Sequence, residues 1–197
     1  MGRKKKYNED NALESAMYLF WRNGYEAVKT RDLADAMGIN SYSLYASFQS
    51  KEELFVRSLD RYLQVIVCDW LVRPLIDEAD GLKAIGNFFE MFVEPGDGTI
   101  PGGCFICNTI VEAEPTRDVL SVIDRYQSML TQAFAGALRR SNPDAESHEI
   151  TSKANLLLCL ILGIAVKKRN GFEGRPMQQV VEQIVEFATP KAKPKGK

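Results

Sequence analysis

A chain of 197 residues can form one large domain or two small ones around a substantial core. Apolar residues make up 45% and charged residues 26% of it, which is typical of a soluble globular protein. The net charge of -1 excludes overall basicity as a route to nucleic acid. The longest apolar run, residues 156–166, is too short to span a bilayer, and the basic N-terminus leads straight into polar residues. We therefore expect neither a membrane span nor a signal peptide.

The inventory of reactive residues argues against an enzyme. Four cysteines without a regular spacing indicate reduced, cytosolic thiols, and the single histidine, His148, argues against a histidine-based metal site or catalytic triad. The sequence has no Gly-rich phosphate loop and no nucleophile elbow. We expect no catalytic residues, no metal and no cofactor.

Helical spacing of apolar residues runs through most of the chain and predicts an all-α fold with about nine helices. The first helix is expected over roughly residues 9–23. Later start signals stand at Asp80-Gly81, Pro115-Thr116, Asn142-Pro143 and Pro176. The helix predicted to open at Asn142 contains the run 156–166, which is apolar on all faces. Such a helix must be covered by its own domain and by a second subunit.

Residues 24–55 predict short helices with well-defined ends. Thr30 is the expected N-cap of one helix, and Gly38 its left-handed C-cap. Asn40 or Ser41 then caps a second short helix, residues 42–47, and residues 50–53 have the capping-box form S-x-x-E that opens a longer helix towards residue 70. This is the spacing of a helix-turn-helix motif. An αα-hairpin that only packs is the alternative.

Hydrogen-bond donors cluster at the starts of these three helices, where backbone N–H groups also bind phosphate. They are Lys29, Thr30, Arg31, Ser41, Tyr42, Ser43, Tyr45 and Lys51. The basic arm, residues 2–6, adds Lys4, Lys5 and Lys6 as candidate DNA contacts. A solvated terminus is the alternative for the arm.

Four segments together resemble the TetR/AcrR family of bacterial repressors: LFWRNGY at 19–25, TRDLA at 30–34, MGI at 37–39 and SLYASFQSKEELF at 43–55. The resemblance implies a homodimer that binds a double-stranded DNA operator and responds to a small-molecule effector. It implies a DNA-binding domain over residues 1–52 and an effector-binding and dimerisation domain over 53–188, whose last two long helices form the dimer. We expect residues 189–197 to be a disordered basic tail.

The resemblance also assigns roles within the motif. Thr30 and Arg31 would contact DNA from the start of the second helix, Ser41, Tyr42 and Ser43 would read base edges, and Tyr45 and Lys51 would contact phosphates. The sequence departs from the family at Ala46 and Ser47, where a bulky aromatic residue or histidine is common. Ser47 would offer only a shorter hydrogen bond, and the basic arm would compensate.

The second half of the chain is rich in aromatic residues and methionine, as the lining of a small-molecule pocket requires. The candidate effector pocket consists of Trp70, Phe88, Phe89, Phe92, Phe105, Asn108, Tyr126 and Met129. The alternative is that these residues form the core.

Residues 101–109, PGGCFICNT, lead into a helix and place Cys104 in its first turn, where the helix dipole favours a thiolate. The segment is similar to a Gly-Cys segment in a branch of the family that senses electrophiles or oxidants. Cys104 is therefore a candidate sensor thiol, with a small buried hydrophobe as the alternative. A zinc site fails because too few ligands are available.

We conclude from the sequence that the chain is a cytoplasmic, effector-responsive repressor that lies at the nucleoid when bound to a pseudo-palindromic operator. In this hypothesis the effector tilts the helix over residues 51–70 and separates the two recognition helices. Two alternatives remain: a repressor that senses oxidants or electrophiles through Cys104, and a helical adaptor that binds no DNA.

Overall fold

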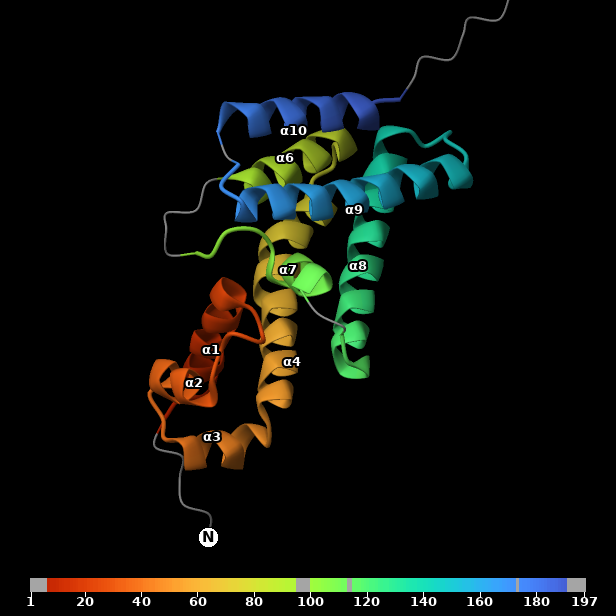
Figure 1. Ribbon diagram of the computed structural model, residues 1–197. Helices are drawn as coiled ribbons and strands as arrows, with labels where there is room; N and C mark the ends of the chain where they lie inside the picture. Colours follow the sequence, from red (N-terminus) through yellow and green to blue (C-terminus); the bar gives the residue numbers. More distant parts are fainter. Residues whose placement is uncertain (1–6, 95–99, 113–114, 173, 191–197) are drawn as a thin grey trace, which may run out of the picture. The chain divides into compact units, whose positions relative to one another are not determined.

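The computed structural model describes residues 7–94, 100–112, 115–172 and 174–190, and within these ranges it contains helices but no strand. The elements are α1 (Glu9–Asn23), α2 (Thr30–Met37), α3 (Ser41–Phe48), α4 (Lys51–Tyr62), η1 (Leu63–Val72), α5 (Arg73–Asp77), α6 (Gly81–Val93), α7 (Phe105–Glu112), α8 (Arg117–Ser141), α9 (Ser147–Arg169) and α10 (Arg175–Ala188) (Figure 1). Because α4, the π-helical η1 and α5 run on without a break, the described residues form nine separate helical segments. The predicted all-α fold is confirmed.

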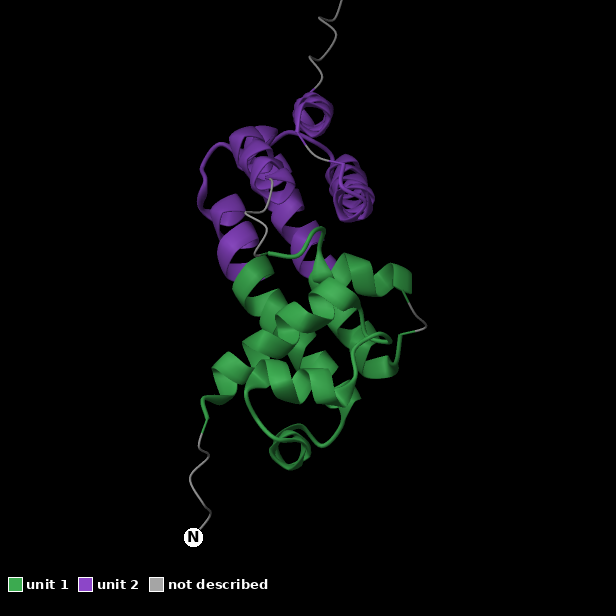
Figure 2. Ribbon diagram, turned by 60° about the vertical axis from the view of Figure 1, so that its left-hand side comes forward, with its two compact units in different colours: residues 1–67, 96–126 green, residues 68–95, 127–197 purple. Residues whose placement is uncertain are grey.

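The chain divides into two compact units (Figure 2). Unit 1 comprises residues 1–67 and 96–126, and unit 2 comprises residues 68–95 and 127–197. Helices η1 and α8 have residues in both units. The predicted domain boundary at residue 52 rests on the family resemblance and stays a prediction. The disordered tail also stays a prediction, since its residues 191–197 lie outside the described ranges.

In unit 1, α1 packs against α2 and α4. Asn8 caps α1, its side-chain oxygen accepting from the backbone N–H groups of Asp10 and Asn11. The buried face of α1 carries Met17 and Phe20, and the ring of Phe20 meets that of Phe55 edge-on, with 5.0 Å between centroids. The amphipathic pattern of residues 9–23 therefore produces a helix with the predicted bounds.

Two predicted helix starts are wrong. Lys29, not Thr30, is the N-cap of α2, because the Asp32 carboxylate accepts from the backbone N–H of Lys29 and draws the helix start one residue back. Asn142 does not cap α9: its carbonyl accepts from Ala145 N–H in a separate turn, and α9 begins at Ser147. A turn and a helix start share the Asn-Pro signal, and here the turn forms.

In unit 2, α10 packs along α6. The ring of Phe134 of α8 stacks with Phe89 of α6 and meets Phe88 edge-on. Asp80 caps α6 by accepting from the N–H groups of Leu82 and Lys83. Next to it, Gly81 packs so closely on α8 that a Cβ atom would lie 1.8 Å from the carbonyl oxygen of Ala137. The Arg140 guanidinium donates to the carbonyl oxygen of Leu75 at 2.7 Å, which ties α8 to α5.

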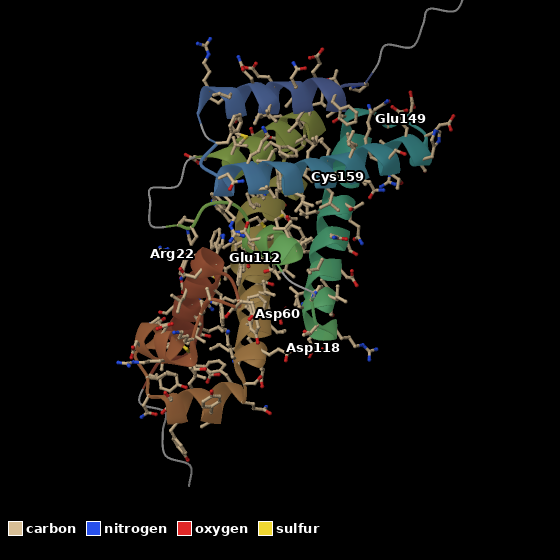
Figure 3. All side chains as sticks on the ribbon, viewed as in Figure 1. Arg22, Asp60, Glu112, Asp118, Glu149 and Cys159 are labelled. Atoms are coloured by element: carbon tan, nitrogen blue, oxygen red, sulfur yellow. The ribbon has the colours of Figure 1, made fainter. Side chains whose placement is uncertain are left out.

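Helix α9 is covered along one side only in the single chain. Ala154, Leu157 and Ile161 are buried, whereas Leu156 is 43% exposed and Cys159 is exposed too (Figure 3). In the described part of the chain, α9 is also the one helix that is long and apolar enough to cross a membrane, although the core helix of a soluble protein meets the same criteria. The apolar part of this helix is therefore longer than the run of residues 156–166, which we expected to be too short to span a bilayer.

Candidate nucleic-acid interface

The turn between α2 and α3 is built around Gly38, as predicted. Gly38 has φ 66° and ψ 30°, and its N–H donates to the carbonyl oxygens at the end of α2. Ile39 N–H also donates to Ala34 O, at 3.0 Å, which completes the cap. A Cβ at Gly38 would meet nothing within 4 Å, so the position favours glycine for its backbone conformation and not for lack of space.

Helix α3 presents its tyrosines outward. Asn40 caps it, the side-chain oxygen accepting from Ser43 N–H at 2.8 Å. Leu44 and Phe48 are fully buried in the core of unit 1, while Tyr42 is 84% exposed and Tyr45 is 48% exposed. The helical period therefore separates an apolar anchoring face from a polar face with two phenol groups.

The structure brings several predicted DNA contacts together. The Tyr45 hydroxyl lies 3.3 Å from Thr30 Oγ1, so the start of α2 and the middle of α3 share one polar surface. Lys29 and Arg31 are exposed beside them. Arg31 Nε lies 3.9 Å from an Asp35 carboxylate oxygen, with both side chains almost fully exposed, so this pair holds Arg31 only weakly.

Two other predicted contacts have partners inside the protein. Lys51 Nζ lies 4.2 Å from the centroid of the Tyr25 ring. Ser47 Oγ lies 2.6 Å from the Tyr7 hydroxyl, a hydrogen bond that ties α3 to the residue before α1. Lys4, Lys5 and Lys6 lie outside the described residues. All the assigned DNA contacts stay predictions.

Two arginines of α4, which our sequence analysis missed, hold the motif to its neighbours. Arg57 donates to the Glu9 carboxylate at 2.9 Å and lies 4.6 Å from the Phe48 ring centroid. Arg61 donates to the Glu14 carboxylate, also at 2.9 Å. Their i, i+4 spacing places them on one face of α4, and the acidic residues of α1 were the signal that could have paired them.

A second cluster of polar groups lies buried in unit 1. Cys104 immediately precedes α7, its carbonyl accepting from Asn108 N–H, and is the N-cap residue instead of a first-turn residue. The Tyr126 hydroxyl lies 3.8 Å from Cys104 Sγ and 3.4 Å from Cys107 Sγ. Both thiols are buried. The structure thus joins the two cysteines and a phenol in one hydrogen-bonded group.

This cluster changes the acidity of its members. Burial opposes ionisation of Cys104, but hydrogen bonds from Cys107, Tyr62 and Tyr126 outweigh it and lower the pKa of Cys104 to about 6. The hydrogen bond to Cys104, with burial, raises the pKa of Cys107 well above its usual value. Burial likewise raises the pKa of Tyr62 and Tyr126. Near neutral pH we therefore expect Cys104 to be a thiolate that accepts hydrogen bonds from the protonated Cys107, Tyr62 and Tyr126.

The predicted effector-pocket residues fall into both units. Phe88, Phe89 and Phe92 are buried in unit 2, and Trp70 is 46% exposed there. Phe105, Asn108 and Tyr126 are buried in unit 1, and Asn108 Oδ1 has no hydrogen-bond partner among the described residues. Met129 of unit 2 is half-buried. The effector pocket stays a prediction.

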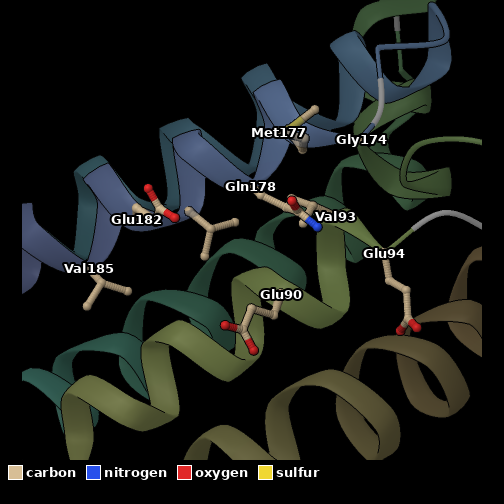
Figure 4. Close-up of a pocket in the computed structure, with 9 residues that line it drawn as sticks. Glu90, Val93, Glu94, Gly174, Met177, Gln178, Glu182 and Val185 are labelled. Atoms are coloured by element: carbon tan, nitrogen blue, oxygen red, sulfur yellow. The ribbon is translucent and has the colours of Figure 1, made fainter.

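Two hollows among the described residues are lined by residues other than the predicted ones. In unit 2 a groove of about 820 Å³ lies between α6 and α10, with carboxylates of Glu90, Glu94 and Glu182 around Val93, Met177, Val181 and Val185 (Figure 4). A smaller hollow of about 180 Å³ lies in unit 1. None of the eight predicted pocket residues lines either of them. Apolar spacing indicates which residues are buried, but not where packing leaves space.

Comparison with known proteins identifies the family. Residues 12–57 match the family described as "Bacterial regulatory proteins, tetR family". The HTH-type transcriptional repressor BdcR of Escherichia coli is 40% identical over 176 residues, which cover 86% of this chain and 83% of BdcR. The chain belongs to the TetR family. The repressor ComR of the same organism is 29% identical over 184 residues, covering 91% of this chain and 88% of ComR.

Solved structures of TetR-family proteins share the fold. A triple cysteine mutant of the regulator CifR, in complex with 26-bp operator DNA, matches with a TM-score of 0.83 at 25% identity, covering 94% of this chain and 98% of that one. The reduced form of E. coli NemR matches with a TM-score of 0.78 at 21% identity, and the match covers 92% of this chain and 98% of the NemR chain. The family, the fold and the assignment as a DNA-binding transcriptional regulator, all predicted from the sequence, are confirmed.

Proposed function

We propose that the chain is a repressor that binds a pseudo-palindromic operator as a homodimer and is released by a small-molecule effector. The observation that carries this proposal is the outward face of α3, where Tyr42 and Tyr45 project beside the exposed start of α2. The complex of CifR with operator DNA and the naming of BdcR and ComR as repressors support it. The chain would work without catalysis, in the cytoplasm and at the nucleoid.

The half-covered helix α9 supports the dimer. Its uncovered side carries Leu156 and Cys159, and an exposed apolar stripe on a long helix favours association with a second subunit. A two-fold dimer would place two α3 helices about 34–36 Å apart, one turn of DNA. The effector would bind the protein away from the DNA and change the angle of α4, lowering operator affinity by about 1–3 kcal/mol.

The test measures binding to duplex DNA at two salt concentrations. Operator sites are first selected from a random pool, and affinity is then measured by filter binding for the selected site and for random duplex. We expect a steep loss of affinity with salt for both, because phosphate contacts release counterions. No measurable affinity for duplex at either salt concentration, with no site selected, would instead support an adaptor that does not bind DNA.

The thiol cluster favours a second candidate function, the sensing of electrophiles. The Cys104 thiolate, held by hydrogen bonds from Cys107 and Tyr62, has the acidity of a reactive thiol. With a benzoquinone, the Cys104 thiolate would form an S–C bond to a ring carbon as the C=C π bond breaks. One carbonyl oxygen would take a proton from water, and the hydrogen of the attacked ring carbon would move to the other oxygen, so that the ring becomes a hydroquinone. Burial of Cys104 would make the local opening of α7 the first step.

Release from the operator by a quinone tests this second candidate. We expect a quinone to release the wild-type protein and the exposed-thiol variant Cys159→Ser, but not Cys104→Ser. If Cys104→Ser is released as readily as the wild type, electrophile sensing through Cys104 is wrong.

A further inference from the structure

A small hollow in unit 1 is separate from the outward face of α3 and from the thiol cluster. It has a volume of about 180 Å³, roughly that of six water molecules. It forms where the loop after α1, the first turns of α4, the end of α7 and the start of α8 come together. Its lining consists of Tyr25, Glu26, Glu52, Phe55, Thr109, Glu112, Pro115, Thr116 and Val119.

The inner wall of this hollow is aromatic and apolar. Phe55 and Val119 are buried, and the rings of Tyr25 and Phe55 lie with their centroids 4.8 Å apart. The one buried polar group of the wall, the Thr109 hydroxyl, donates to the carbonyl oxygen of Phe105 at 2.9 Å. The wall therefore offers ring faces and methyl groups, and its hydroxyl hydrogen is already used.

The rim of the hollow is acidic. Glu26 and Glu52 are exposed, and neither forms an ion pair with another residue in the described part of the chain. Their negative charges act on the ring beneath them: after burial, Glu52 and then Glu26 raise the pKa of Tyr25. The Glu112 carboxylate lies against Gly24, so close that a Cβ there would be 2.6 Å from Oε2.

An ammonium group of the protein already contacts one ring of this lining. Lys51 Nζ lies 4.2 Å from the centroid of the Tyr25 ring, within the distance at which a ring face attracts a cation. This contact is independent of the carboxylates. It shows that the Tyr25 ring accepts an ammonium ion at this place in the fold.

We propose that this hollow binds a small organic ammonium ion of about the size of choline. The rings of Tyr25 and Phe55 would hold its methyl groups, and the carboxylates of Glu26 and Glu52 would balance its charge. A bound ion would contact α4, α7 and α8 together, which makes the hollow a second place where a small molecule acts on α4. The proposal does not depend on DNA binding.

The test is a calorimetric titration of the full-length protein with choline and with 3,3-dimethylbutan-1-ol, which has the same shape without the charge. We expect saturable binding of choline and at least about 10-fold weaker binding of the alcohol. No binding of choline, or equal binding of the two compounds, would overturn the proposal.

Single variants then locate the site. Glu26→Gln and Glu52→Gln should each weaken choline binding at least about 3-fold, whereas Glu53→Gln, one residue along α4 and outside the lining, should leave it nearly unchanged. Lys51→Gln removes a positive charge beside the Tyr25 ring and should tighten binding of the cation. If the two lining variants bind like the wild type while Glu53→Gln does not, choline binds elsewhere and the assignment of this hollow is wrong. Circular dichroism checks that each variant is folded.

Discussion

The hydroxyl of Tyr45 lies 3.3 Å from Oγ1 of Thr30, which joins the middle of α3 to the first residue of α2. In Tyr45→Phe this hydrogen bond is lost while the ring keeps its place. Because the pair is exposed, we expect the free energy of unfolding to change by no more than about 0.5 kcal/mol. Affinity for all duplex sequences should fall together, since Tyr45 is predicted to contact phosphate. Chemical denaturation and filter binding measure the two effects.

Tyr42 and Lys51 should differ in what their removal does to DNA binding. Tyr42 is 84% exposed, so Tyr42→Ala should leave stability nearly unchanged. It should cost about 1–3 kcal/mol of affinity for the selected site and reduce the preference over other sequences. Lys51→Ala should weaken all sequences alike and reduce the salt dependence. If Tyr42→Ala keeps the full sequence preference, Tyr42 does not read a base.

Gly38 should resist replacement because of its backbone conformation. At φ 66° any residue with a Cβ is strained, so Gly38→Ala should destabilise the protein by about 1 kcal/mol. The matched control is Gly136→Ala within α8, where the nearest atom to the new methyl group would be an Arg140 nitrogen at 3.6 Å. That change should stabilise by about 0.5–1 kcal/mol. If thermal melts show Gly38→Ala to be more stable than Gly136→Ala, the left-handed conformation of Gly38 is not what favours glycine there.

The thiol cluster predicts a titration near pH 6. The pKa of Cys104 is lowered to about 6 from its ordinary value of 9.0, so between these values the folded protein has lost a proton that the unfolded chain keeps. Cys104 therefore contributes stability that is complete above about pH 9 and is lost as pH falls through about 6. Thiolate absorbance near 240 nm should show this titration in the wild type and in Cys159→Ser, and lose it in Cys104→Ser.

The uncovered side of α9 predicts how the dimer can be broken. Leu156→Glu would place a carboxylate in the proposed interface, and burying that charge should raise the dimer dissociation constant at least about 10-fold. Leu120→Glu is the matched control, since Leu120 is 44% exposed but lies near the start of α8. Light scattering after gel filtration measures the mass of each variant. Equal dimerisation of both variants would place the interface elsewhere.

Interactions between residues close in the sequence were predictable, and those between distant residues were not. The Gly38 turn and the Ser50 cap were predictable because their donors and acceptors lie within three or four residues. The hydrogen bond between Tyr7 and Ser47 spans 40 residues, and no local pattern indicates it. The same holds for Tyr62 beside Cys104: the local helix start indicated a reactive thiol, but the phenols that lower its pKa come from other helices.

The failure at Asn142 has a different cause. Asn followed by Pro is a good start for a helix and equally good for a turn, and the residues that follow decide between them. Residues 143–146 are Pro, Asp, Ala and Glu, and none of them has a large apolar side chain that would anchor a first helical turn there. The pockets were missed because they depend on how neighbouring helices fill space, which the burial pattern of one helix does not contain.

The close approach of α6 to α8 at Gly81 has a consequence for variation at this position. Alanine already brings a carbon atom to 1.8 Å from the Ala137 oxygen, so every other amino acid would push the two helices apart. In a saturation library selected for folding, position 81 should return glycine alone, while the half-buried neighbour Leu82 accepts several apolar residues.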